Sequence, residues 1–526
     1  MRGRPRAALA AEAIAAVALA LAVAAVVLAA TDAHARPGGG SSYSGGGGGG
    51  GGGGSYGGGG GGGGGDGVVG ALLAFIFSAL PWPLKLLLVG VIVAIYVTTK
   101  VRNRRMEGWN SAGTASWDVA LPTRPPVRAN PTYGTTALST RRRLEDLRSF
   151  DPDFSVVLFE DFLYALYAHV RYAAAGRPDR LSAFLAPDVL AQLRAVHVAE
   201  VHTVIVGALR FTDVRGLEGS AAQVEVDVEI ESNVASVAAP GQPERTAYCL
   251  ERWTLARKKD AHSRPPARAR ILSCPGCGAP LDAVVEGTCT HCKRAVAGGD
   301  FDWVVRAAHV VESQERGPML TTEVPEEGND LPTVVDPEAH RRCAAIGQKD
   351  PFFQWPAFEA RVGLVFREFQ AAWTKRDLLQ MRPYFTDALF DTQRYWVEAY
   401  TAQGLRNVTD GARIVRLELA RVASDRWLDA ITVRLSATGL DYVVRDADGK
   451  VARGSTSRER PYTEYWTFIR GAAHTGPTRT APECPSCGAP MAVGMAGDCR
   501  YCRAKVTTGE FDWVLSRIEQ DEAYRG

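Results

Sequence analysis

Eight of the ten cysteines in this 526-residue chain fall into two sets with the same spacing, C-x2-C-x11-C-x2-C. The second set lies 210 positions after the first, so the pattern is duplicated. Two short knuckles joined by a hairpin-sized spacer can bring four thiolates to the corners of a tetrahedron, which is the geometry that a zinc ion accepts. The predicted zinc ligands are Cys274, Cys277, Cys289, Cys292, Cys484, Cys487, Cys499 and Cys502.

Both predicted zinc ions are structural, because four cysteines close the coordination shell and no position remains for a metal-bound water. A disulfide framework is the alternative, but it requires an oxidising compartment and conflicts with the topology argued below. His291 in the first set is matched by Tyr501 in the second, so we expect His291 to be a surface residue. Cys249 and Cys343 have no counterparts and are expected to be plain thiols.

The cysteine sets lie between matching segments that predict β-strands. "ERWTLAR" (251–257) and "EYWTFIR" (464–470) precede them, and "FDWVVR" and "FDWVLSRI" follow. In the following segments, one face is predicted to carry Phe301, Trp303 and Val305, or Phe511, Trp513 and Leu515. Each cysteine set is therefore predicted to be a zinc ribbon inserted in the loop of a hairpin.

Helical spacing and then strand alternation recur upstream of each ribbon. Apolar side chains at helical spacing are Phe159, Phe162, Leu163, Leu166, Tyr167 and Val170 in the first copy, and Val362, Val365, Phe366, Phe369 and Trp373 in the second. "VEVDVEIE" (224–231) then alternates, and Ile431, Val433 and Leu435 repeat this pattern, so one face should be buried and the other in water. Helices followed by an antiparallel sheet predict an α+β fold.

The N-terminal part of the chain has a different composition. Residues 1–35 read as a signal peptide, with an uncleaved anchor as the alternative, and residues 36–67 are a Gly-rich tether that cannot form a core. Residues 68–99 are apolar and predict a transmembrane helix, broken by Pro81-Trp82-Pro83. Basic residues directly follow this span, so the C-terminal part should face the cytoplasm of a bacterial inner membrane.

The segment from Phe366 to Asn407, followed by "EYWTFIR", resembles the Tim44-like domain, a member of the nuclear-transport-factor-two-like cone fold. The resemblance is best over 352–526 and weaker over 154–315. It implies a membrane-linked domain with a hydrophobic pocket, contacts with lipid or protein partners, and a role in protein transport. The mitochondrial member of this family has one such domain and lacks ribbons, so its motor-anchoring role does not carry over by residues.

Two other classes of function have weaker support in the sequence. Cone folds of this superfamily also include enzymes, and Asp387 and Tyr384 of the second copy are the candidates for catalytic residues. The histidines, however, show neither metal-ligand nor catalytic-triad spacing. We therefore expect no enzymatic activity. Nucleic-acid or ribosome binding is the other alternative, through Arg500, Arg503 and Lys505 on one ribbon and Lys293 and Arg294 on the other. A net charge of +2 argues against nucleic acid.

The sequence thus predicts a membrane-anchored, non-enzymatic scaffold that binds a protein partner, such as a translocase subunit or a chaperone, or anionic lipid. The candidates for the lipid contact are the basic residues after the span, Lys100, Arg102, Arg104 and Arg105, and, further on, Arg141, Arg142 and Arg143; a role in topology is the alternative for the first four. The predicted parts are a signal peptide (1–35), a tether (36–67), a transmembrane segment (68–99), a linker (100–150), a first Tim44-like domain (151–315) with a zinc ribbon (271–297), an acidic Pro-rich linker (316–349), and a second Tim44-like domain (350–526) with a zinc ribbon (481–507).

Overall fold

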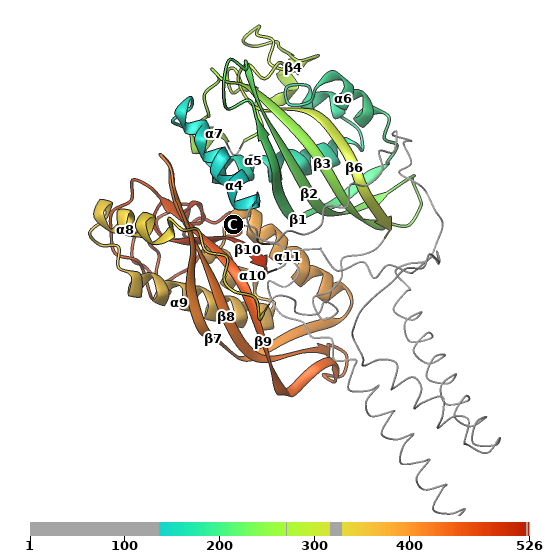
Figure 1. Cartoon of the computed structure of the whole chain (residues 1–526). Helices are drawn as coiled ribbons and strands as arrows, with labels where there is room; N and C mark the ends of the chain where they lie inside the picture. The colour runs from blue at the N-terminus through green and yellow to red at the C-terminus, as the bar shows by residue number, and fades with distance from the viewer. Residues whose placement is uncertain (1–135, 270, 316–328, 522–523, 525) are drawn as a thin grey trace, which may run out of the picture. The chain divides into compact units, whose positions relative to one another are not determined.

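The computed structural model describes residues 136–269, 271–315, 329–521, 524 and 526, all of which fall in one compact unit. This unit contains two four-stranded antiparallel sheets with helices packed on them, so the predicted α+β class is confirmed at this level (Figure 1). We call residues 136–315 the N-terminal half and residues 329–526 the C-terminal half.

In the N-terminal half the helices largely precede the strands. Its helices are α4 (Thr136–Glu145), α5 (Val156–Ala173), α6 (Pro187–Arg194) and α7 (Pro266–Ala269), with 3-10 turns η2 (Asp146–Ser149), η3 (Pro178–Leu181) and η4 (Leu281–Ala283). Its strands are β1 (Glu200–Arg215), β2 (Gln223–Val237), β3 (Arg245–Lys258), β4 (Val284–Val285), β5 (Thr288–Cys289) and β6 (Val304–Glu315). The main sheet has the order β1-β2-β3-β6, and β4 pairs with β5.

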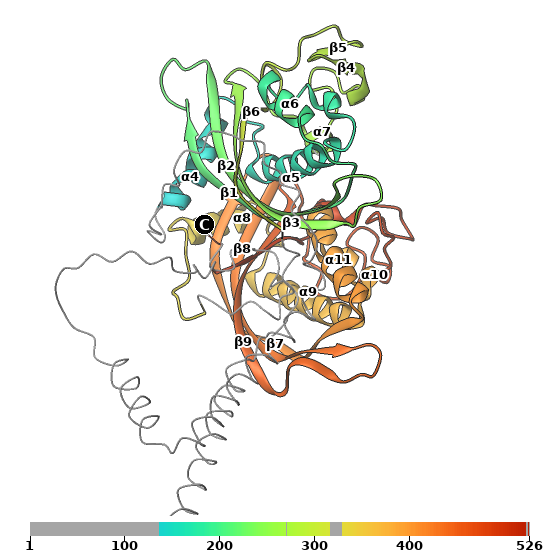
Figure 2. The same ribbon diagram turned by 90° about the vertical axis from the view of Figure 1, so that its right-hand side faces the viewer.

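The C-terminal half repeats this order of elements. Its helices are α8 (Ala339–Lys349), α9 (Trp355–Lys375), α10 (Leu378–Met381) and α11 (Asp387–Ala402), with 3-10 turns η6 (Arg382–Tyr384) and η7 (Val506–Thr508). Its strands are β7 (Leu405–Ser424), β8 (Leu428–Arg445), β9 (Val451–Gly471) and β10 (Val514–Gln520), in the sheet order β10-β9-β8-β7. In Figure 2, α9 lies in the hollow of the curved strands β7, β8 and β9.

The long helices α5 and α9 form where the apolar spacing predicts them. Every residue that the sequence assigned to their aromatic faces is buried. The Ser155 hydroxyl accepts a hydrogen bond from the Leu158 N–H at 3.3 Å and so caps the start of α5. Helix α9 ends at Lys375, because the next residue, Arg376, has left-handed backbone (φ 58°). Each helix buries its aromatic face against the sheet of its own half.

The strands confirm the predicted alternation in one half only. In β2, Val224, Val226, Val228 and Ile230 are buried and the residues between them are partly exposed, but Glu231, predicted to face water, is buried. In β8, by contrast, all residues from Leu428 to Leu435 are buried, so the prediction of a solvent-facing side is wrong there. The segment that precedes α8 covers part of this face. There the Leu331 carbonyl accepts a hydrogen bond from Arg434 at 2.6 Å.

Two other expectations are corrected. Strand β6 begins at Val304 and β10 at Val514, so Phe301, Trp303, Phe511 and Trp513 precede the strands instead of lying in them. Residues 339–349, assigned to the acidic linker, form α8. Earlier in the same segment, the Val334 N–H donates to the Tyr465 hydroxyl and the Asp336 N–H donates to the Ala420 carbonyl. Residues 136–149, assigned to the first linker, form α4 and η2. Short polar helices such as these carry too little apolar periodicity to be recognised.

The three arginines of α4 pair with carboxylates. Arg141 contacts Glu160 at 3.0 Å, Arg142 contacts Asp336 at 2.6 Å, and Arg143 contacts Asp213 at 3.7 Å. These pairs supply a structural role for a cluster that the sequence offered as a lipid contact.

No helix in the described ranges is long and apolar enough to cross a membrane. The predicted signal peptide (1–35), tether (36–67) and transmembrane segment (68–99) all lie outside the described residues.

Candidate functional site

The structure brings each set of four cysteines together. Within each set the sulfur atoms all lie within 4.8 Å of one another, so each set could hold a metal ion. The first set lies between β3 and β6, and the second between β9 and β10, and each of these strand pairs is antiparallel. The predicted placement of both sets in the connection of a hairpin is therefore confirmed.

The sulfur spacing fits a tetrahedral metal site. A zinc–sulfur bond of about 2.3 Å places tetrahedral sulfurs about 3.8 Å apart. The Sγ atoms of Cys277 and Cys289 are 3.8 Å apart, and those of Cys484 and Cys502 are 3.9 Å apart. A disulfide bond would require about 2.05 Å. Four soft sulfur ligands at this spacing match the preferences of zinc.

The protein environment favours charged sulfurs at some positions. Backbone N–H groups, that of Cys292 first, lower the pKa of Cys289 to about 6, and the N–H of Ala504 contributes most to lowering the pKa of Cys502 to about 6. Burial raises the pKa of Cys274 and of Cys484 to about 12. A metal-bound thiol is deprotonated. A cation between the sulfurs would therefore offset the cost of burying a charged thiolate at Cys274 and at Cys484.

The knuckles of the two sets share their backbone geometry. Lys293 and Arg503 each follow the fourth cysteine of their set, and both have left-handed backbone, with φ of 61° and 65°. The His291 Nδ1 atom lies 3.7 Å from Cys277 Sγ, where it contacts a ligand sulfur without belonging to the four-cysteine cluster. Tyr501, its counterpart, is 62% exposed. The prediction that His291 is not a ligand agrees with this placement.

Asp387, a candidate for acid–base chemistry, instead joins α11 to the second ribbon. Its carboxylate accepts a hydrogen bond from Lys505 Nζ at 2.7 Å and pairs with the buried guanidinium of Arg382. Burial would raise the pKa of Asp387, but the bonds from Lys505 and Arg382 outweigh it and lower this pKa. Tyr384 is buried in the core, where burial raises its pKa to about 12. Asp387 thus forms its ion pairs with Lys505 and Arg382, whereas the Tyr384 ring lies 5.6 Å from the Arg361 guanidinium.

The basic side chains offered for nucleic-acid binding are partly engaged. Lys505 pairs with Asp387, and the Arg294 guanidinium lies 5.6 Å from the ring centre of Phe301. Arg500 and Arg503 are exposed on the second ribbon.

A cavity of about 690 Å³ lies in the C-terminal half between α8 and β7. Helix α8 lines it with His340, Cys343, Ala344 and Gly347, which share one face because they are spaced i, i+3, i+4 and i+7. Strand β7 contributes Leu417, Glu418 and Leu419, and the cavity is completed by Val335, Phe353 and Trp355. Its volume lies within the range typical of small-ligand sites.

Two polar side chains of this cavity, Glu418 and Trp355, have hydrogen-bond partners within the protein. The Glu418 carboxylate accepts a hydrogen bond from Thr333 at 2.7 Å, and the Trp355 indole N–H donates to Glu359 at 2.8 Å. Burial raises the pKa of Cys343, so its thiol is neutral at pH 7. The lining therefore presents mainly apolar surface to an occupant.

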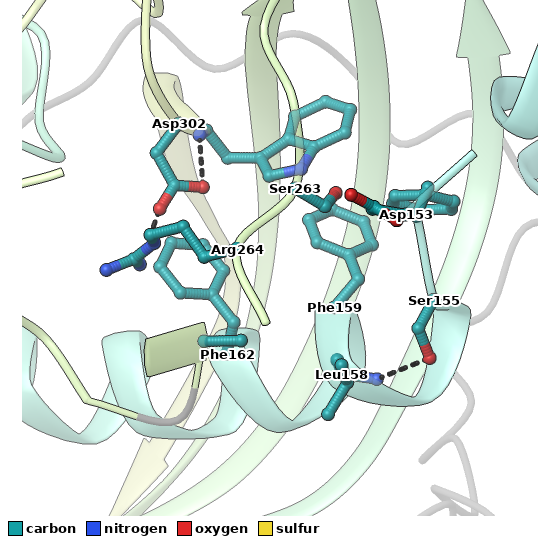
Figure 3. Close-up of a pocket in the computed structure, with 11 residues that line it drawn as sticks. Asp153, Ser155, Leu158, Phe159, Phe162, Ser263, Arg264 and Asp302 are labelled. Carbon is teal, nitrogen blue, oxygen red and sulfur yellow. Dashed lines mark hydrogen bonds and ion pairs between the residues drawn. The ribbon is translucent and has the colours of Figure 1, made fainter. Parts of the chain in front are cut away.

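A much smaller pocket of about 30 Å³ lies in the N-terminal half (Figure 3). It is lined by aromatic rings, including Phe159 and Phe162, and the ion pair of Arg264 and Asp302 lies at its border. This volume holds about one or two water molecules, so the pocket has no room for a larger ligand.

Sequence reasoning missed a buried ion pair that occurs in both halves. Asp151 pairs with Arg257 at 2.9 Å, and Asp350 pairs with Arg470 at 2.9 Å. Each arginine is the last residue of a matching strand segment, and each aspartate is the first residue of the matching "DPDF" or "DPFF" segment. The equivalent positions of these residues in the two copies indicate that they share a role. Comparing the polar residues of the two copies could have identified these positions.

Comparisons with known proteins agree with part of this account. No curated protein matches the chain. Among solved structures, it is similar to an "Ntf2 like protein involved in plasmid conjugation", with 8% identity, 68% of this chain and 94% of that chain covered, and a TM-score of 0.16. A TM-score this low carries no argument. Residues 339–479, which contain the elements from α8 to β9 and most of the cavity lining, match the family model of the Tim44-like domain, so the predicted resemblance is confirmed for this part of the chain.

Proposed function

We propose that this chain is a membrane-anchored, non-enzymatic scaffold that binds a protein partner through its C-terminal Tim44-like domain. The observation that carries this proposal is the largely apolar cavity of about 690 Å³, since most of its lining lies within the residues that match the Tim44-like family. A cavity whose lining is mostly apolar favours an apolar anchor from a partner. The N-terminal half serves as a second Tim44-like domain with the same order of elements.

In this proposal each half carries a structural zinc ion held by four cysteines. The support is the fit between the sulfur spacing and tetrahedral zinc. A zinc ion there would supply cross-linking of the two knuckles of each ribbon. The eight cysteines hold the metal, and no cysteine is assigned to catalysis.

The proposed location is the bacterial inner membrane, with the described residues in the cytoplasm. The supports are the apolar segment 68–99 and the basic residues that follow it. A partner at this site belongs to protein transport or assembly, for which a translocase subunit or a chaperone is the expected class. Anionic lipid is the competing occupant of the cavity.

Site-specific photocrosslinking of the full-length chain in its own membranes tests this proposal. A photoreactive amino acid at Leu417, which lines the cavity, should yield one discrete protein adduct. The same group at Val451, which is 46% exposed and does not line the cavity, is the matched control. Mass spectrometry identifies the adduct.

The outcomes separate the alternatives. A translocase or chaperone subunit captured at Leu417 and not at Val451 supports the scaffold. A lipid adduct at Leu417 would replace the protein partner with a lipid, and ribosomal protein or RNA would favour a translation role. Recovery of the chain in the soluble fraction would contradict membrane anchoring.

A further inference from the structure

The two cysteine sets differ in their exposure to solvent. Cys274, Cys289, Cys484 and Cys499 are buried, but the other members differ between the sets. In the first set Cys277 and Cys292 are partly buried, whereas in the second set Cys487 and Cys502 are exposed. The second set is therefore the more accessible of the two to a chelator or a competing thiol.

The sets also differ in their connection to the core. Cys274 and Cys289 belong to the main hydrophobic cluster of the N-terminal half, together with Trp303 and Leu185. Cys484 and Cys499 form a separate small cluster with Val493 and Val506, against which Met491 packs. Opening the first set would expose part of a domain core, but opening the second would expose this small cluster and the Arg382 side chain that contacts the ribbon.

Polar contacts fasten the second ribbon to the helices of its half. The Met495 carbonyl accepts a hydrogen bond from Arg382 Nε at 2.7 Å, and Lys505 Nζ donates to Asp387 at 2.7 Å. The side chains of Lys505 and Asp387 are 43% and 55% exposed, so water can replace this contact when the ribbon opens. Gly497 packs closely here, since a Cβ on it would lie 2.9 Å from Arg382 Nη2.

We infer that the second metal centre exchanges its ion while the C-terminal half stays folded, whereas the first centre holds its ion as part of a domain core. This inference rests on the proposed occupancy of both centres by zinc. The attachment of the second ribbon to its half then depends on the metal ion. When the second ion leaves, the contacts of the ribbon with Arg382 and Asp387 weaken, while the sheet and the long helices of the C-terminal half stay folded.

Zinc release into an excess of a metallochromic chelator tests the inference on the full-length, zinc-loaded chain. We expect two kinetic phases of one ion each, with rates that differ at least tenfold. The double variant C484S/C487S should lack the fast phase and keep the slow one. Fluorescence of the buried Trp466 and Trp513 should persist through the fast phase.

Alkylation of the wild-type chain provides a second measurement that needs no variant. N-ethylmaleimide followed by peptide mass spectrometry should modify Cys487 and Cys502 before Cys277 and Cys292. A single release phase, a fast phase that survives in C484S/C487S, or earlier modification of the first set would overturn the inference. A chain that binds no zinc would instead contradict the proposed structural zinc, so the two failures are distinguishable.

Discussion

Arg470 and Asp350 form an ion pair in which both side chains are completely buried, with 2.9 Å between Nη1 and Oδ2. The Arg470 guanidinium also lies 4.7 Å from the ring centre of Trp513 and 5.8 Å from that of Phe353. A buried guanidinium is tolerated only when a carboxylate and π faces replace its hydration. The pair thus joins the end of β9, the turn before α9 and the residue that precedes β10.

Removing one partner of this pair should be strongly destabilising. We expect D350A to lower the free energy of unfolding by about 3 to 5 kcal/mol, because it leaves an uncompensated charge in the core. Urea titration followed by tryptophan fluorescence measures this change. The double variant D350A/R470M provides the control, since it removes both charges and should lose less than the sum of the single variants. Additive losses would show that the two side chains are not coupled.

The stability of this region should depend on pH through His474. Burial and the positive charge of Arg470 lower the pKa of His474 below 6.5, although Asp512 and Asp350 partly oppose the shift. The unfolded chain therefore takes up the proton at a higher pH than the folded chain, so this contribution is complete above about pH 6.5 and declines as the pH falls toward the folded pKa. H474Q should show a smaller loss of stability between pH 7 and pH 5.5 than the wild type. Equal slopes would contradict this assignment.

The fastening of the second ribbon should depend far more on Arg382 than on Lys505. K505M removes an exposed ion pair and should cost no more than about 1 kcal/mol. R382M removes a buried group that hydrogen-bonds the Met495 and Phe385 carbonyls, and should cost about 2 to 3 kcal/mol. Hydrogen exchange should locate the loss of protection in R382M to residues 493–507. Protection unchanged in R382M would place the attachment elsewhere.

Gly347 offers a way to place a side chain in the cavity without disturbing the fold. A Cβ added there would lie 3.9 Å from the Phe353 ring, which is an ordinary contact. The φ angle of Gly347 is not positive, so a side chain there causes no backbone strain. G347A should therefore stabilise the chain by about 0.5 to 1 kcal/mol by favouring helix α8. G347L should fold equally well while its side chain occupies the cavity. Thermal unfolding of both variants checks this, and a lower Tm for G347A would show that α8 does not form as described.

The sequence predicted the parts of this fold that depend on local spacing. Helical periodicity identified α5 and α9, and the repeated cysteine spacing identified both four-cysteine clusters and their place in the hairpins. It could not predict that Asp350 meets Arg470, 120 positions later, because such a contact depends on how the strands are arranged. Nor could it predict the burial of both faces of β8, since the covering segment reads as a linker. The resemblance implied a hydrophobic pocket, but the residues that α8 contributes to the cavity were not identified, because α8 was assigned to that linker.

The decisive measurement is the adduct yield from a photoreactive group at Leu417 in native membranes, compared between the wild-type chain and G347L. If the cavity binds the partner, G347L should reduce the protein adduct at least tenfold at equal expression, and G347A should leave most of it. An adduct of equal yield in G347L would contradict the claim that this cavity is where the scaffold binds its partner.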